Sequence, residues 1–170
     1  MRILALVPGG IGDQILFFPT LDDLKLSYPE SQIDVIVEPR SKSAYQVCKS
    51  VGDVLSYDFK DANSLADWGN LLGIMRDREY EAVISLGQRW TVGLLLWLTG
   101  IPKRIGYASN GAIFLSDPIP LKTEQYAAQM YHDLLQGMNI NTTFKGISIN
   151  VLKTDIDWAE AEQQRLGVAE

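Results

Sequence analysis

The stretch Gly9-Gly10-Ile11-Gly12-Asp13 is the most informative part of this 170-residue chain. An apolar run precedes it and predicts a first strand over residues 2–8, and a second apolar run predicts a helix over residues 13–28. Glycines between a strand and a helix let the backbone turn sharply and approach a ligand closely. Ligands of open α/β sheets lie just outside the carboxyl ends of the strands. The carboxylate of Asp13, at a helix start on that edge, is therefore a candidate for chemistry.

Asp13 has two interpretations. The partial positive charge of a helix N-terminus stabilises an ionised carboxylate, which suits a base that must start deprotonated. Aspartate is also favoured at helix starts because it caps free backbone N–H groups. From the spacing alone a catalytic role and a capping role both stay open, and capping alone would suit a non-enzymatic binding module.

A glycine-rich turn between strand and helix is also found in dinucleotide-binding domains. The fingerprint G-x-G-x-x-G needs a third glycine for close packing of the helix on the sheet. Counted from Gly10, the second glycine is Gly12, but the third position is Ile15. Glu38, at the end of the second predicted strand, does stand where such domains carry a ribose-binding acid. An oxidoreductase domain with a nicotinamide cofactor therefore remains an alternative.

Predicted strands and helices alternate along the chain. The strands are expected at residues 2–8, 33–38, 54–59, 80–86 and 103–107, with a further extended segment at 113–121. The helices are expected at residues 13–28, 41–51, 65–78, 90–99 and 123–138. This alternation predicts an α/β fold with a doubly wound, mostly parallel, Rossmann-like sheet. Beyond it, an extended stretch at 147–151 and a polar helix over 158–166 read as a connector to something that the chain lacks.

Composition excludes several classes of function. The net charge is −6 and no block of Lys or Arg is present, so we expect no nucleic-acid partner. The single cysteine excludes a disulfide within the chain, which fits a reducing compartment. The single histidine, His132, gives no recognisable zinc spacing, so no metal site is predicted. The longest apolar run, residues 92–98, is far too short to span a membrane.

The segment from Val7 to Leu21 resembles the opening of glycosyltransferase family 9, the lipopolysaccharide heptosyltransferases. Shared features are the strand, the Gly-rich turn, Gly-Asp, the apolar helix start and Pro19. Further similar blocks follow in family order at residues 24–29, 33–37, 80–86 and 100–107. The resemblance implies the GT-B architecture, in which two Rossmann-like halves face each other across a cleft.

This chain is similar to the N-terminal half of that architecture, which holds the acceptor. The resemblance therefore implies an acceptor-side domain over residues 1–152 and, over 153–170, the start of a linker to a C-terminal donor-binding domain. The implied reaction is an inverting transfer of a heptose or similar sugar from a nucleotide-sugar to a lipopolysaccharide or other glycan, free or lipid-linked. No cofactor is expected, and the chain alone should be inactive. The implied location is the cytoplasm, with peripheral contact at the inner face of the cytoplasmic membrane.

The family's catalytic base falls on Asp13. An inverting transfer needs such a base to take the proton of the acceptor hydroxyl as its oxygen attacks the anomeric carbon. Residues expected to contact the acceptor are Gly9, Gly10, Gly12, Gln14, Gln88, Arg89 and Arg104. Two positions depart from the family pattern: Val7 stands where Arg or Lys is usual, and Tyr126 where a later helix often begins with histidine. Both departures weigh against a phosphorylated lipopolysaccharide core as the acceptor.

Overall fold

A single parallel sheet forms the centre of the molecule. The structure is a computed structural model that describes residues 1–59 and 64–167. Its six strands are all parallel, in the order β3-β2-β1-β4-β5-β6. They are β1 (Arg2–Val7), β2 (Gln32–Val37), β3 (Asp53–Ser56), β4 (Ala82–Ser85), β5 (Lys103–Tyr107) and β6 (Asp117–Ile119). This order confirms the doubly wound α/β fold that the alternation predicts.

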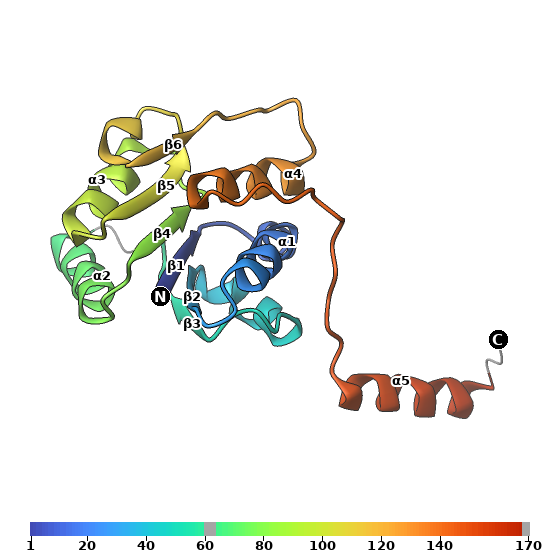
Figure 1. Ribbon diagram of the computed structural model, residues 1–170. Helices are drawn as coiled ribbons and strands as arrows, with labels where there is room; N and C mark the ends of the chain where they lie inside the picture. Colours follow the sequence, from blue (N-terminus) through green and yellow to red (C-terminus); the bar gives the residue numbers. More distant parts are fainter. Residues whose placement is uncertain (60–63, 168–170) are drawn as a thin grey trace.

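Helices cover both faces of the sheet (Figure 1). One face carries α1 (Ile11–Ser27), α4 (Ala127–His132) and two 3₁₀ helices, η1 (Pro39–Val47) and η3 (Asp133–Met138). The other face carries α2 (Leu65–Asp77) and α3 (Trp90–Thr99). β1 lies between these layers: Ile3, Ala5 and Val7 pack toward α1, while Leu4 and Leu6 pack toward α2 and α3. A strand covered on both faces must be apolar throughout, which explains its uninterrupted apolar run.

Three predicted elements differ in the structure. The expected helix at 41–51 is the 3₁₀ helix η1, which Pro39 begins. The expected helix at 123–138 divides into α4 and η3, where a Cβ on Gly137 would lie 2.7 Å from the Ile105 side chain. The glycine thus lets η3 pack close against β5. The segment predicted as extended first forms a 3₁₀ turn, η2 (Ala112–Phe114), before β6.

The last helix lies apart from the sheet. Residues 147–151, predicted as extended, have no assigned secondary structure and join no strand, and Asn150 donates a backbone hydrogen bond of 2.9 Å to the Val47 carbonyl. The polar helix predicted after them is α5 (Lys153–Leu166), which has no buried residue and points away from the body in Figure 1. An exposed polar helix gains little stability from packing against the rest of the chain, which is typical of a helix that connects two domains.

Charged side chains near the amino ends of the strands form a structural cluster. Asp34 on β2 is fully buried, and its carboxylate accepts hydrogen bonds from Tyr80 Oη at 2.8 Å and Arg78 Nη1 at 3.2 Å. Arg2 lies 3.4 Å from the same oxygen. A buried carboxylate is tolerated when it is paired and hydrogen-bonded in this way. The charges at the amino ends of the strands are therefore paired with one another within the fold and stabilise it.

His132 ties the end of α4 to α1. Its Nε2 lies 2.9 Å from Asp23 Oδ2 and 3.3 Å from Thr142 Oγ1. Burial opposes ionisation of Asp23, but hydrogen bonds with Thr142 and His132 outweigh it and hold the pKa of Asp23 below 3.8. The ionised aspartate thus stabilises the folded state.

This contact predicts a pH dependence of stability. The pKa of Asp23 is lower in the folded chain, so its contribution is present above the ordinary value of 3.8 and lost as pH falls through the folded value. We expect Asp23→Asn to be less stable than wild type at neutral pH and to lose less stability under acid, measured by urea unfolding at several pH values. The exposed Asp157→Asn on α5 is the control and should follow wild type. Identical pH profiles for Asp23→Asn and wild type would contradict the assignment.

Candidate functional site

The glycine turn after β1 fixes Asp13 through its backbone. Asp13 stands at the third position of α1, where its Oδ2 accepts a hydrogen bond of 2.9 Å from the Gly10 N–H. Gly9 adopts φ +134°, and a Cβ there would overlap Oδ2 and lie 2.8 Å from Asp13 Cγ. Only glycine suits that backbone and leaves room for the carboxylate.

Tyr131 holds the other oxygen of the Asp13 carboxylate. Its hydroxyl, on α4, donates a hydrogen bond of 2.9 Å to Asp13 Oδ1, and its ring packs edge-on against Phe17. Burial raises the pKa of Tyr131 to about 12, with the hydrogen bond to Asp13 and the charge of Asp13 adding to the effect, so the hydroxyl stays protonated. Sequence reasoning missed Tyr131, which lies 118 residues from Asp13.

Gln14 supports the turn from beneath. Its side chain is fully buried, and its amide donates to the carbonyls of Val7 at 3.1 Å and Gly10 at 3.3 Å. Its Oε1 accepts a hydrogen bond of 2.8 Å from Tyr45 Oη. This corrects the expected acceptor contact of Gln14, because the side chain is closed off from any ligand and already bonded within the fold.

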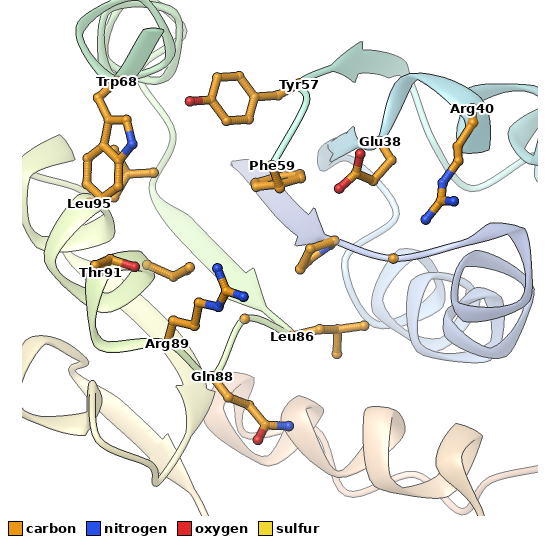
Figure 2. A pocket seen from close by; sticks show the side chains of 14 residues that line it. Glu38, Arg40, Tyr57, Phe59, Trp68, Leu86, Gln88, Arg89, Thr91 and Leu95 are labelled. Atoms are coloured by element: carbon orange, nitrogen blue, oxygen red, sulfur yellow. The ribbon is translucent and has the colours of Figure 1, made fainter. Parts of the chain in front are cut away.

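A cleft of about 600 Å³ opens at the carboxyl edge of the sheet (Figure 2). It lies between the turns that follow β1 and β4, which lead to α1 on one face and to α3 on the other. Such a divergence is the topological switch point where open α/β sheets bind ligands. The lining residues are Pro8, Gly9, Glu38, Arg40, Tyr57, Phe59, Trp68, Leu86, Gly87, Gln88, Arg89, Thr91, Val92 and Leu95.

Three of the expected acceptor contacts line this cleft: Gly9, Gln88 and Arg89. Asp13 does not line it, but its carboxylate stands against Gly9, which does. Gly10 and Gly12 lie in the same turn, and a Cβ at either would meet no atom within 4 Å. The turn therefore brings the candidate base to the margin of the cleft.

Arg104 does not belong to the site, which corrects the expectation for this residue. It lies near the start of β5, whereas Asp13 follows the carboxyl end of β1. Its guanidinium donates to the carbonyls of Phe114 at 2.8 Å, Ile101 at 2.6 Å and Pro102 at 3.2 Å. Arg104 therefore holds the segments around β5 together.

The cleft combines charges with an aromatic wall. Arg40 and Arg89 are exposed and have no ion pair within the described part of the chain, and Figure 2 shows Arg89 reaching toward the middle of the cleft. Tyr57 and Phe59 pack edge to face with ring centroids 5.1 Å apart, and Trp68 lies across from them. Pockets with apolar walls and a few polar groups suit ligands that carry hydroxyl groups as well as an apolar C–H face, as sugars do.

Gly12 offers a test of why the turn carries glycine. Gly12 is exposed in the first turn of α1, and a Cβ there would meet no atom within 4 Å. Packing therefore does not require glycine at this position. We expect Gly12→Ala to raise the free energy of unfolding by about 0.5–1 kcal/mol, because alanine loses less backbone entropy in a helix. Urea unfolding measures it, and a loss of stability would show a structural need for glycine.

The described residues hold neither a candidate metal cluster nor a candidate membrane-spanning helix. There, no three His, Cys, Asp or Glu side chains come together in a way that could hold a metal ion. Across residues 1–59 and 64–167, no helix is long and apolar enough to cross a membrane.

Solved structures of sugar transferases share this fold. A glycosyltransferase family 9 structure from Veillonella parvula matches 99% of the chain and 50% of its own length, with a TM-score of 0.82 and 20% identity. The ADP-heptose lipopolysaccharide heptosyltransferase II of Escherichia coli matches 95% and 50%, with a TM-score of 0.78 and 17% identity. The fold is that of one half of a family 9 glycosyltransferase. The resemblance seen in the sequence is thereby confirmed.

A third solved structure with this fold, the Escherichia coli heptosyltransferase WaaC, was solved with ADP-2-deoxy-2-fluoro heptose. It matches 87% of this chain and 51% of its own, with a TM-score of 0.73 and 17% identity. This chain thus spans about half the length of the solved family 9 structures.

Two curated relatives match by sequence. The photosynthetic NDH subunit of subcomplex B 1 from the chloroplast of Arabidopsis thaliana is 32% identical over 85 residues, which is 49% of this chain and 18% of that protein. Lipopolysaccharide heptosyltransferase 3 of Escherichia coli is 24% identical over 97 residues, which is 55% of this chain and 28% of that protein. No protein-family model matches the chain. One relative is therefore named as a sugar transferase and the other as a subunit of a photosynthetic complex.

Proposed function

We propose that this chain is the acceptor-binding half of an inverting glycosyltransferase. The observation that carries the proposal is the placement of Asp13. Its carboxylate is held by Gly10 and Tyr131 and stands against Gly9, at the margin of a switch-point cleft with aromatic walls. The fold shared with family 9 transferases supports the same function.

In this proposal Asp13 is the general base. It takes the proton of an acceptor hydroxyl while that oxygen forms a bond to the anomeric carbon of the donor sugar. The bond from that carbon to the nucleoside diphosphate breaks, and the leaving group departs with the electron pair. Each carboxylate oxygen accepts one hydrogen bond from the protein, so each keeps capacity for the acceptor hydroxyl. Gly10 and Tyr131 fix the carboxylate toward that hydroxyl.

The remaining parts of the proposal concern substrates and domains. Arg40 and Arg89 are free to bind an anionic substituent of the acceptor. The donor is a nucleotide-sugar such as ADP-heptose, bound by a second half that α5 leads to, so that residues 1–152 form the acceptor domain and 153–170 begin the linker. On the family resemblance alone, we propose a cytoplasmic reaction on a glycan or lipid-linked glycan at the inner face of the membrane.

The stereochemistry of transfer tests this function. A protein that carries this chain with a donor-binding half is incubated with ADP-heptose and a glycan acceptor, and the anomeric configuration of the product is read by NMR. A base that activates the acceptor directly requires inversion at the anomeric carbon. A product of retained configuration would contradict the role of Asp13.

A non-enzymatic role is the second candidate, and the match to the photosynthetic NDH subunit favours it. In that case the fold serves as a binding module and Asp13 is only a helix cap. Replacement of Asp13 would then cost about 0.5–2 kcal/mol of stability and change no activity. Measuring stability and turnover on the same Asp13 variant separates the two candidates.

A further inference from the structure

Glu38 is a charged group of the cleft that the proposed chemistry leaves unused. It follows the carboxyl end of β2 and lines the cleft, yet the residue is only 6% exposed. Its side-chain oxygens make no hydrogen bond or ion pair with any other residue of the described chain. The Glu38 oxygens are not among the buried side-chain atoms that lack a partner, so the carboxylate opens onto the cleft that it lines. A polar group that faces a cleft without a protein partner is a candidate ligand contact.

Asp34, on the same strand, shows how this fold treats a structural carboxylate. It is fully buried and bonded to Tyr80, Arg78 and Arg2. Glu38, at the opposite end of β2, has no comparable partner, although Arg40 and Arg89 line the same cleft. The fold therefore leaves the hydrogen-bonding capacity of Glu38 for something outside the protein.

The surroundings of Glu38 indicate which chemical groups such a ligand must carry. In Figure 2 its carboxylate turns toward Phe59 and the interior of the cleft. An ionised carboxylate only accepts hydrogen bonds, and its two oxygens match two neighbouring hydroxyl donors. Aromatic side chains beside it offer apolar faces for the C–H side of a ring.

We infer that Glu38 binds a vicinal diol of the ligand, with the ring that carries the diol against the aromatic wall. This inference rests on the proposed function. It makes Glu38 a specificity-determining residue that selects acceptor sugars with two adjacent free hydroxyls. A diol is also present in the ribose of a nucleotide, so the test includes both sources.

The test is saturation-transfer NMR with this chain and defined probes. One arm uses methyl glycosides of mannose, galactose and heptose, and the other uses adenosine and NAD. We expect a glycoside to bind wild type, and binding to weaken about 10- to 100-fold in Glu38→Gln, because hydrogen bonds to a charged acceptor are lost. The exposed Glu30→Gln is the matched control and should bind as wild type does.

A second readout separates binding from structure. Because Glu38 has no partner in the described chain, Glu38→Gln should leave the melting temperature within about 2 °C of wild type. A larger drop in the melting temperature would show a structural role and overturn the inference.

The outcomes distinguish this inference from the proposed function. Equal glycoside binding by wild type and Glu38→Gln, or no binding of any probe by wild type, overturns the role of Glu38 and leaves the base role of Asp13 standing. Binding of adenosine or NAD alone, lost in Glu38→Gln, supports the diol contact but contradicts an acceptor site.

Discussion

Asp13→Asn is expected to lower turnover by about 10²–10⁴-fold in a protein that carries this chain with a donor-binding half. Asparagine keeps the size of the side chain and one oxygen acceptor, so the bond from Gly10 survives. The amide cannot take a proton from the acceptor hydroxyl. The loss should therefore fall on the rate of transfer, with the melting temperature nearly unchanged, as measured by nucleotide release and thermal unfolding.

Asp67→Asn is a matched control. Asp67 is the third residue of α2, as Asp13 is of α1, and its Oδ2 accepts from the Ser64 N–H at 3.1 Å. It caps a helix without lining the cleft. We expect Asp67→Asn to cost at most about 1 kcal/mol of stability and to keep full turnover. If both variants keep wild-type turnover, Asp13 is only a cap.

Gly9→Ala is expected to damage both stability and activity. Alanine is strained at φ +134°, and its Cβ would press on the carboxylate of Asp13. We expect a loss of about 2–4 kcal/mol in the free energy of unfolding, measured with urea. Turnover should fall in the fraction that still folds, because the displaced carboxylate no longer meets the acceptor.

The neighbouring glycine supplies the comparison for this variant. Gly10 has φ −79°, and a Cβ there meets no atom within 4 Å. Gly10→Ala should therefore cost less than about 1 kcal/mol. Equal losses for the two variants would show that the turn tolerates a side chain at Gly9, against the proposed geometry.

The positions of the strands could be predicted from apolar patterning, because each buried strand is a short run bounded by Gly, Pro or polar residues; their order in the sheet required the structure. β1 was recognisable because a strand covered on both faces has no polar positions. The 3₁₀ segments were not, since η1 and η3 share the composition of ordinary helices. What tightens η3 is the close approach of Gly137 to Ile105, which no local pattern encodes.

The site was predictable only in part. The turn at Gly9 and the position of Gln88 and Arg89 after β4 follow from strand direction, since all strands end at one edge. The same reasoning applied to Arg104, at the start of β5, indicates the other end of the sheet. The contact of Tyr131 with Asp13 depends on how α4 packs on α1, which a single sequence does not reveal.

Glu38 shows most clearly what a single sequence does not reveal about the site. Its place at the end of β2 was visible in the sequence, where it suggested ribose binding. That its side chain is buried without a partner, beside aromatic residues, required the structure. A lone acid at a strand end is usually solvated, and only its neighbours distinguish that case from a ligand contact.

Thermal unfolding of this chain with saturating NAD, NADP, ADP-sugars and UDP-sugars distinguishes an acceptor-binding half from a dinucleotide-binding domain. A ligand at 100 times its dissociation constant stabilises by about 2.7 kcal/mol, which raises the melting temperature of a chain of this size by about 5–10 °C. We expect no such shift with any nucleotide, because in the proposed function the donor binds to the other half of the transferase. A clear shift with NAD or NADP would contradict it and make the cleft a dinucleotide site.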